Sequence, residues 1–292
     1  MAKDTMMPTS RASLCALGEY LRRHCFFAPV RAQVQMPQKM VRYRPGEKGL
    51  DSVLGLLGGA KTIAPSTVTI RVDPAVQRAC GRTGCAEPST IARTLQACPA
   101  ETVAPLSRVS WYYLKRSGQP PHHRYAERLL GVDVEVTPLP IGVQAEGRER
   151  TWMGRQRSKT GRTVLRWTAS EYREMLHETW LRGKASAVPA LQAALGELET
   201  RLGWTRERRQ RIVLRRDGGF GTTELLNGLL SRGYQVVAKL RHQGRVQRWR
   251  RELGPWQPTS SPGRESAAVF RPHRCCRTTR QWVMRTPKEK GG

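Results

Sequence analysis

Residues 211–240 read RIVLRRDGGFGTTELLNGLLSRGYQVVAKL, and this stretch decides the fold class. The apolar residues of 211–216 predict a strand that ends at Asp217, and the glycines directly after it predict a tight turn. Thr222 is a suitable N-cap for a helix that Gly233 ends, and 234–240 has the composition of a second strand. A strand, a helix and a strand in this order form a βαβ unit, so the sequence predicts an α/β sheet.

A further strand is predicted upstream of this unit. In 129–136, valines alternate with Asp133 and Glu135, so both carboxylates fall on one face of the strand. Pro138 and Pro140 are expected to end it. The other elements predicted between these two regions are a strand over 163–168, a helix from its N-cap Ser170 to Leu181, and a helix from Pro189 to Leu202.

The first part of the chain is predicted to be helical. Apolar residues recur at helical spacing in 12–27 and in 50–57. A short helix capped by Ser89 and a second helix over 102–116 follow, with arginines on their outer face. Two helices across a short turn suit a helix-turn-helix DNA reader, and they equally suit a packed helical pair with solvated charges.

Two changes of pattern divide the chain. A linker over 117–123 contains Gly118, Pro120 and Pro121, and beyond Leu240 the chain becomes rich in Arg, Pro and Ser with little periodicity. We therefore predict a helical DNA-binding region over 1–120, an α/β domain over 121–241, and the start of an irregular or β-rich insertion over 242–292.

The charge of the chain indicates a polyanionic partner. Among its 292 residues, 51 Lys and Arg stand against 23 Asp and Glu, which gives a net charge of +28. A hydrophobic content of 38% is enough for a real core. No apolar run approaches the roughly 20 residues that span a bilayer, and the N-terminus lacks the pattern of a signal peptide. We therefore expect a cytoplasmic protein that binds nucleic acid and no membrane.

The cysteines favour reduced thiols. There are seven of them, an odd number without regular spacing, which is unlike a disulfide framework. Cys80, Cys85 and Cys98 lack a nearby fourth ligand for zinc, so free core thiols are the favoured interpretation.

Three acids form the candidate catalytic site: Asp133, Glu135 and Asp217. Phosphodiester chemistry on DNA commonly uses two divalent metals held by carboxylates at strand ends. Each acid also has a simpler interpretation, a solvated strand face for the pair and a turn carboxylate for Asp217. The glycines after Asp217 match neither the dinucleotide fingerprint nor the P-loop.

With these motifs the chain resembles the DDE transposases of bacterial insertion sequences. In that family the first catalytic aspartate lies in a strand motif Asp-x-Asp-x-Thr, and the second ends the strand before Gly-Phe-Gly. Asp217 matches the second, whereas 133–137 reads DVEVT, with Glu135 at the expected metal-binding aspartate. The resemblance covers nearly the whole chain and runs through 71–78, 84–95, 133–140, 145–154, 213–221 and 225–239.

The third acid of the family, a helical glutamate, follows a long insertion, and this chain ends before such a helix. The resemblance therefore implies a C-terminally truncated, impaired transposase. No role is assigned to the remaining C-terminal acids Glu252, Glu265 and Glu289.

The resemblance implies a ribonuclease-H-like mixed sheet with flanking helices, preceded by a small helical DNA-binding region. It implies DNA strand cleavage and strand transfer with Mg²⁺ or Mn²⁺ held by Asp133, Glu135 and Asp217. The alternatives are a non-catalytic DNA-binding protein or inhibitor derived from a transposase, and a decayed reading frame. The implied partners are double-stranded transposon ends and a second copy of the chain or a full-length transposase subunit, in association with the nucleoid.

Basic residues in both halves of the chain are expected to contact DNA phosphates, because phosphate contacts dominate affinity for duplex DNA. These residues are Arg93, Arg108, Lys115, Arg116, Arg148, Arg155, Lys159, Arg215 and Arg216.

Overall fold

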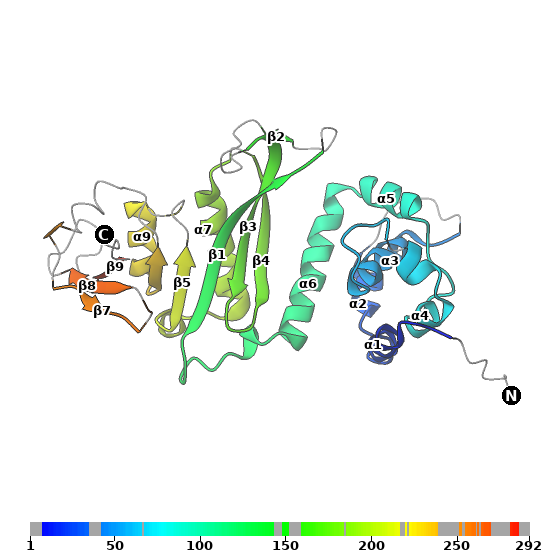
Figure 1. Cartoon of the computed structure of the whole chain (residues 1–292), viewed down its shortest axis with the longest axis horizontal. Helices are drawn as coiled ribbons and strands as arrows, with labels where there is room; N and C mark the ends of the chain where they lie inside the picture. Colours follow the sequence, from blue (N-terminus) through cyan, green and yellow to red (C-terminus); the bar gives the residue numbers. More distant parts are fainter. Residues whose placement is uncertain are drawn as a thin grey trace, which may run out of the picture. The chain divides into compact units, whose positions relative to one another are not determined.

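A computed structural model shows two compact units, Met1–Arg116 and Ser117–Gly292 (Figure 1). The residues that the structure describes are 8–34, 42–65, 67–142, 148–151, 159–183, 185–216, 220, 222–238, 251–252, 255–260, 262, 264–269 and 281–285. No helix among them is both long enough and apolar enough to cross a membrane.

The first unit is helical, as the sequence predicts. Its core joins Leu50 and Leu54 to Ile70, Val76 and Leu21, which are all buried. Its elements are α1 (Ala12–Arg23), α2 (Ala28–Gln33), α3 (Pro45–Leu57), a π-helical turn (Thr67–Arg71), α4 (Pro74–Ala79), α5 (Pro88–Gln96), a 3-10 turn (Ala100–Thr102) and α6 (Val103–Ser117).

A buried ion pair ties α3 to the loop before α5. Arg82 Nε donates to Asp51 Oδ1 at 3.0 Å, and Arg82 Nη1 donates to Glu47 Oε1 at 2.6 Å. The backbone N–H of Ala86 donates to Asp51 Oδ2 at 2.9 Å. Burial raises the pKa of Asp51, against the opposing effect of the hydrogen bonds from Ala86 and Arg82. The carboxylate therefore depends on these donors to stay charged in the core.

The described residues of the second unit form a six-stranded mixed sheet. Strand β3 pairs with β1 along one edge and with β4 and β2 along the other. On its second edge β1 pairs with β5, which pairs with β6. The strands are β1 (Leu130–Pro140), β2 (Glu149–Arg150), β3 (Thr160–Ala169), β4 (Glu174–Arg182), β5 (Ile212–Arg216) and β6 (Gln235–Ala238); the helical segments are a 3-10 turn (Pro120–His122), α7 (Ala187–Leu202), α8 (Arg206–Arg209) and α9 (Thr223–Ser231).

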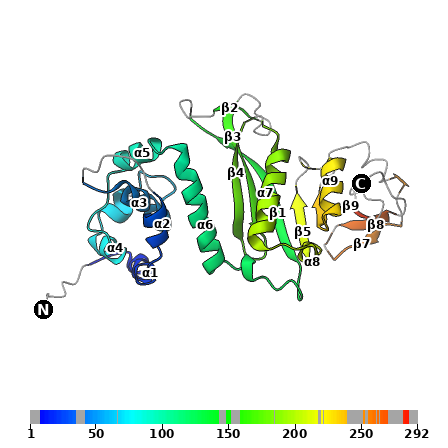
Figure 2. The same cartoon turned by 180° about the vertical axis from the view of Figure 1, so that it is seen from behind.

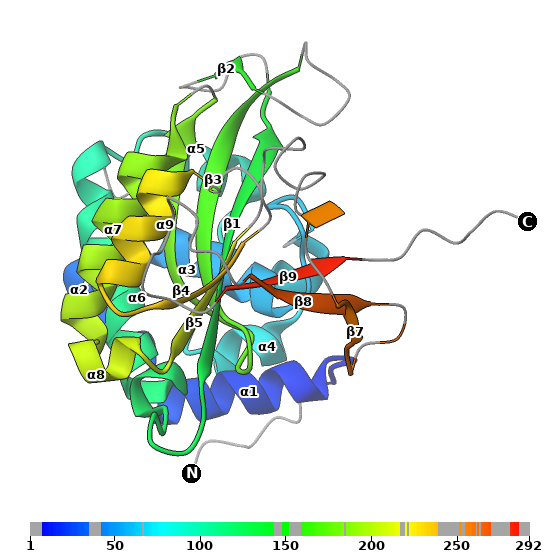
Figure 3. The same cartoon turned by 90° about the vertical axis from the view of Figure 1, so that its left-hand side faces the viewer.

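The strand directions confirm the mixed sheet that the sequence predicts. Strands β4, β3 and β1 are antiparallel neighbours, whereas β1, β5 and β6 run parallel. Helix α9 makes the crossover between β5 and β6, which is the predicted βαβ unit. Helix α7 lies in front of the sheet in Figure 2, and Figure 3 shows α7 and α9 on one side of it.

The helix-covered face of the sheet is apolar. Val132 and Val134 of β1 and Leu214 of β5 are fully buried, as are Leu191 and Leu198 of α7. Each fully buried Leu contributes about 1.5–3 kcal/mol relative to an exposed one. Because side chains alternate along a strand, the residues between these valines face the opposite side.

The helix predicted from Ser170 to Leu181 is wrong. Ser170 begins a turn in which Arg173 has a φ of 55°, and β4 follows from Glu174. In β4, Glu178 pairs with Arg166 of β3, with Arg166 Nε 2.6 Å from Glu178 Oε2. Pairing with the neighbouring strand, which no local pattern shows, overrides the helical spacing in this segment.

Pro138 does not end β1, contrary to the prediction, whereas Pro140 is the last residue of the strand. The two prolines pair with Thr163 and Gly161 of β3. The Leu130 N–H donates to Arg211 O at 2.8 Å, on the side of β1 that faces β5. Backbone N–H groups point to alternate edges of a strand, so the nitrogens of Pro138 and Pro140 face the same edge as that of Leu130. Within the described residues, β5 pairs with β1 only as far as Val134. The missing N–H groups therefore cost no ladder hydrogen bond there.

A second, smaller sheet lies in the C-terminal part of this unit. It contains β7 (Gln257–Pro258), β8 (Glu265–Val269) and β9 (Gln281–Arg285) in antiparallel order.

Glu199 on α7 anchors the segments around β5 and β6. It accepts hydrogen bonds from Arg232, through Nε at 3.1 Å and through Nη2, and from Tyr234 Oη at 2.7 Å. Arg209 Nη1 lies 3.3 Å from its Oε1. Burial opposes ionisation, but these donors and charges outweigh it and hold the pKa of Glu199 below its ordinary value.

The stability of the second unit is therefore expected to fall in acid. A depressed folded-state pKa gives stability that is present above the unfolded value of 4.5 and is lost as the pH falls through the folded value. We expect Glu199→Gln to cost about 2 kcal/mol at pH 7 and to flatten the pH dependence below pH 4.5. Urea denaturation from about pH 7 to about pH 3 measures both effects. If the free energy of unfolding depended on pH in the same way in wild type and Glu199→Gln, this role of Glu199 would be contradicted.

Candidate functional site

Asp133 and Glu135 share one face of the central strand β1. Val132 and Val134 are buried on the other face, whereas Asp133 is partly exposed and Glu135 is exposed. Two residues along a strand place these carboxylates roughly 7 Å apart. The predicted common face of the pair is confirmed.

Both carboxylate oxygens of Asp133 already have partners. Arg215 Nε donates to Oδ1 at 2.6 Å, and Arg215 Nη2 donates to Oδ2 at 2.7 Å. Ser170 Oγ donates to Oδ2 at 2.9 Å. Arg215 is the register partner of Asp133 on the parallel strand β5, and its hydrogen bond to Asp133 raises the pKa of the guanidinium. Asp133 is thus the acceptor of a bidentate ion pair.

Glu135 is differently placed. Its register partner on β3 is Arg166, whose Nε donates to Glu178 across the next strand pair. Within the described part of the chain, the carboxylate of Glu135 has neither a hydrogen bond nor an ion pair. Glu135 is therefore an uncommitted acid on the same face as Asp133.

Asp217, the third predicted acid, lies outside the described residues. The last described residue of β5 is Arg216, which is the register partner of Val134. Among the described residues, no group of three His, Cys, Asp or Glu side chains could hold a metal ion. Asp133 and Glu135 fit Mg²⁺ or Mn²⁺ in donor type, since these ions prefer carboxylate oxygens, but Arg215 competes for Asp133.

Arg216 projects to the buried face. It is 5% exposed, and no hydrogen-bond acceptor for its guanidinium lies among the described residues. Burial lowers the pKa of Arg216 to about 10. The exposed basic surface therefore does not include this residue.

The other predicted DNA contacts are exposed where the structure describes them. Arg155 lies outside the described residues. Arg116 is held on α6, where its Nη1 donates to Tyr112 Oη at 2.9 Å. The remaining exposed side chains are Arg93 of α5, Arg108 and Lys115 of α6, Arg148, Lys159 and Arg215.

No local pattern in the sequence indicates the partners of Asp133. Ser170 was assigned to a helix cap, but its N–H donates to Gly131 O at 2.9 Å and thereby brings its hydroxyl to the carboxylate. Arg215 is predicted to contact DNA, and the parallel register of β1 and β5 also places it beside Asp133. Only the register of the strands reveals these contacts.

The described cysteines include two buried thiols, as predicted for the core. Cys80 and Cys85 are both free and buried. Burial raises the pKa of Cys80 to about 11 and that of Cys85 to about 12. Both thiols therefore stay protonated at neutral pH, which is unfavourable for binding a metal as thiolates.

Comparisons with known proteins find likenesses of structure but none of sequence. No protein-family model matches the chain, and no curated protein matches it significantly. A piggyBac transposase synaptic complex with hairpin DNA is similar at 11% identity and a TM-score of 0.43, covering 99% of this chain and 65% of that chain. A pre-cleavage Mos1 transpososome is similar at 11% identity and a TM-score of 0.27, and the match covers 84% of this chain and 72% of the Mos1 chain. This chain thus spans about 65% of the length of the piggyBac chain, and likenesses this weak carry no function over to it.

Proposed function

We propose that this chain is a transposase-type DNA-binding protein of an insertion sequence, with a second unit related to metal-dependent DNA strand cleavage and strand transfer. The observation that carries this proposal is the placement of Asp133 and Glu135 together on the central strand of a ribonuclease-H-like sheet. Asp217 follows directly in sequence after Arg216, the end of the neighbouring strand β5. Acids at such strand positions suit phosphodiester chemistry.

In this proposal Asp133, Glu135 and Asp217 hold Mg²⁺ or Mn²⁺. The metal, when bound, activates the attacking oxygen and stabilises the leaving one. Arg215 keeps Asp133 paired until an anion arrives, because its guanidinium bonds carboxylate and phosphate in the same bidentate way. A DNA phosphate that draws Arg215 away frees both oxygens of Asp133 from the guanidinium and leaves only the Ser170 hydroxyl on Oδ2. Binding of DNA and binding of metal at Asp133 are therefore coupled.

The DNA partner is supported by the net charge of +28. We propose that 1–120 binds DNA, that 121–241 forms the catalytic core, and that 242–292 begins an insertion. Double-stranded transposon ends are the proposed ligand, and a second copy of the chain or a full-length transposase subunit is the proposed protein partner. The residues proposed to contact phosphates are Arg93, Arg108, Lys115, Arg116, Arg148, Arg155, Lys159 and Arg215.

One observation favours a second candidate function, a DNA-binding protein without catalysis that acts as an inhibitor of a transposase. The bidentate Arg215 pair occupies Asp133, and glutamate stands at position 135. A supercoiled plasmid that carries the flanking DNA of the gene, incubated with Mg²⁺ or Mn²⁺, separates the two functions. Nicking that Asp133→Asn abolishes supports the enzyme. Salt-sensitive binding without nicking supports the inhibitor.

Removing the competing cation is expected to strengthen metal binding. We expect Arg215→Met to raise the affinity for Mn²⁺ about tenfold in calorimetry, because the substitution frees Asp133 and removes a positive charge beside it. Asp133→Asn is expected to lower the affinity. Arg128→Met removes the same charge from an exposed position of the same unit and serves as the control.

Equal Mn²⁺ affinity in wild type, Arg215→Met and Asp133→Asn would remove Asp133 from the metal site. An equal increase of the Mn²⁺ affinity in Arg215→Met and Arg128→Met would show that the increase comes from net charge alone.

A further inference from the structure

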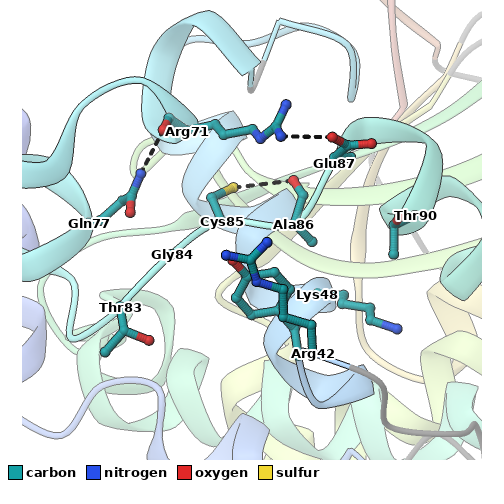
Figure 4. Close-up of a pocket in the computed structure, with 11 residues that line it drawn as sticks. Arg42, Lys48, Arg71, Gln77, Thr83, Gly84, Cys85, Ala86, Glu87 and Thr90 are labelled. Carbon is teal, nitrogen blue, oxygen red and sulfur yellow. Dashed lines mark hydrogen bonds and ion pairs between the residues drawn. The ribbon is translucent and has the colours of Figure 1, made fainter.

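A pocket of about 620 Å³ opens in the first unit (Figure 4). It is lined by the residues before α3, by α3 itself, by the loop before α5 and by the first turn of α5. Its charged lining residues are Arg42, Lys48, Arg71 and Glu87, so three cations stand against one carboxylate. The proposed catalytic face belongs to the other unit, and this pocket is a separate site.

Lys48 is the central feature of this pocket. It is 8% exposed and is one of the residues that line the pocket (Figure 4). The neighbouring acids are committed elsewhere, because Glu47 and Asp51 both bind Arg82. No hydrogen bond or ion pair reaches the Lys48 ammonium from the described residues. An ammonium that opens to a cavity, on a largely buried side chain and without an acidic partner among the described residues, is suited to an anion.

Thr90, in the first turn of α5, lines the pocket and can add a backbone donor to it. Its N-cap Glu87 makes no side-chain capping bond, and its first residue Pro88 has no N–H. Ile91 is the first residue of this helix whose N–H reaches a carbonyl, that of Glu87 at 2.9 Å. The N–H groups of Ser89 and Thr90 have no partner among the described residues. They lie at the positive end of the helix dipole, where anions bind.

The only carboxylate of the described lining is already neutralised. Arg71 Nη2 donates to Glu87 Oε1 at 2.7 Å, and Figure 4 shows this pair at the edge of the pocket. Because Arg71 and Glu87 neutralise each other, the positive charges of Lys48 and Arg42 remain available to a ligand. Arg42 is positioned by Tyr43, whose ring centroid is 5.5 Å from its guanidinium carbon. Gly84 makes room for this ring, since a Cβ there would lie 2.4 Å from Tyr43 Oη.

We propose that this pocket binds a phosphate group, with the Lys48 ammonium and the N–H group of Thr90 as donors and Arg42 at its rim. The phosphate belongs either to a DNA backbone or to a free phosphorylated molecule. The DNA source rests on the function proposed above, whereas the pocket itself does not. A volume of about 620 Å³ holds far more than one phosphate, which leaves room for the rest of a nucleotide.

Two titrations of the full chain test this proposal, one with a fluorescent 20-base-pair duplex and one with adenosine monophosphate, with adenosine as the uncharged control. Lys48→Met keeps the apolar stem and removes the ammonium. It is expected to weaken binding of the phosphate-bearing probe about tenfold. Lys61→Met removes the same charge from an exposed position of the same unit and is expected to change binding by less than twofold.

A measurement on the unsubstituted chain keeps the test valid if Lys48→Met fails to fold. Acetic anhydride labels exposed amines, and mass spectrometry compares Lys48 with Lys61. The probe that occupies the pocket is expected to protect Lys48 at least fivefold and to leave Lys61 unprotected. Equal labelling of Lys48 with and without both probes would overturn the proposal.

The outcomes separate the two phosphate sources. Weaker duplex binding by Lys48→Met, without binding of the mononucleotide, supports a backbone phosphate. Mononucleotide binding that depends on Lys48, with unchanged duplex binding, supports a free phosphorylated ligand and removes the DNA source. Duplex binding that is equal in Lys48→Met and Lys61→Met, without mononucleotide binding, overturns the pocket while the proposed function stands. Binding of neither probe by wild type overturns both.

Discussion

Raising the salt concentration from about 50 to about 200 mM is expected to weaken duplex DNA binding by this chain about 1,000-fold or more. The net charge is +28, and most of the basic residues proposed as contacts are exposed. If roughly 6–10 phosphates are neutralised, the condensed counterions that are released make binding steeply salt-dependent. Anisotropy titrations with a labelled duplex at several KCl concentrations give the slope of log K against log salt.

Single substitutions then show which cations contribute to this slope. Lys115→Gln on α6 is expected to reduce the slope by about one, because one phosphate contact is lost. Arg216→Gln is expected to leave it unchanged, since Arg216 is 5% exposed. A slope near zero for the wild type would exclude phosphate contacts as the main source of affinity.

Breaking the buried ion pair of the first unit is expected to cost about 3–5 kcal/mol. Asp51→Ala removes the buried carboxylate of the pair and leaves Arg82, whose side chain is only 3% exposed, with the partly exposed Glu47 as its remaining acidic partner. The N–H of Ala86 also loses its acceptor, so the loop that lines the phosphate pocket is expected to loosen. Hydrogen exchange of the amides in α3 and in 82–87, followed by mass spectrometry, measures the change locally.

A double substitution distinguishes loss of the pair from loss of packing. Asp51→Leu with Arg82→Met replaces both charges by apolar groups, and it is expected to recover most of the stability lost in Asp51→Ala. Glu19→Ala breaks exposed ion pairs with Arg22 and Arg23 and is the matched control, with no measurable loss expected. An Asp51→Ala protein as stable as Glu19→Ala would show that the pair contributes little.

Local patterns were sufficient for the main features of the sheet. The apolar run before Asp217, the Thr222 cap and the valines around Asp133 each act within a few residues, and each appears as predicted wherever the structure describes it. The segment after Ser170 was misassigned because its helical spacing competes with pairing to β3, a contact between strands. Local propensity decides an element only where tertiary pairing agrees with it.

The candidate site was predicted less completely for the same reason. The common face of Asp133 and Glu135 follows from the period of a strand. The pairing of Asp133 with Arg215 follows from the parallel register, and the isolation of Lys48 follows from the commitment of both neighbouring acids to Arg82. Contacts between distant segments determine these features, and the spacing of residues along the sequence does not predict such contacts.

The prolines of β1 also affect how copies of this protein meet. Beyond Val134 the described part of β5 offers β1 no partner, so this edge of β1 resembles a free strand edge, the kind of surface that recruits strands from other chains. Pro138 and Pro140 remove two of the N–H groups on this edge that an incoming strand would bond, and that of Val136 remains. The same residues that interrupt no hydrogen bond within the sheet therefore protect the molecule against edge-to-edge aggregation.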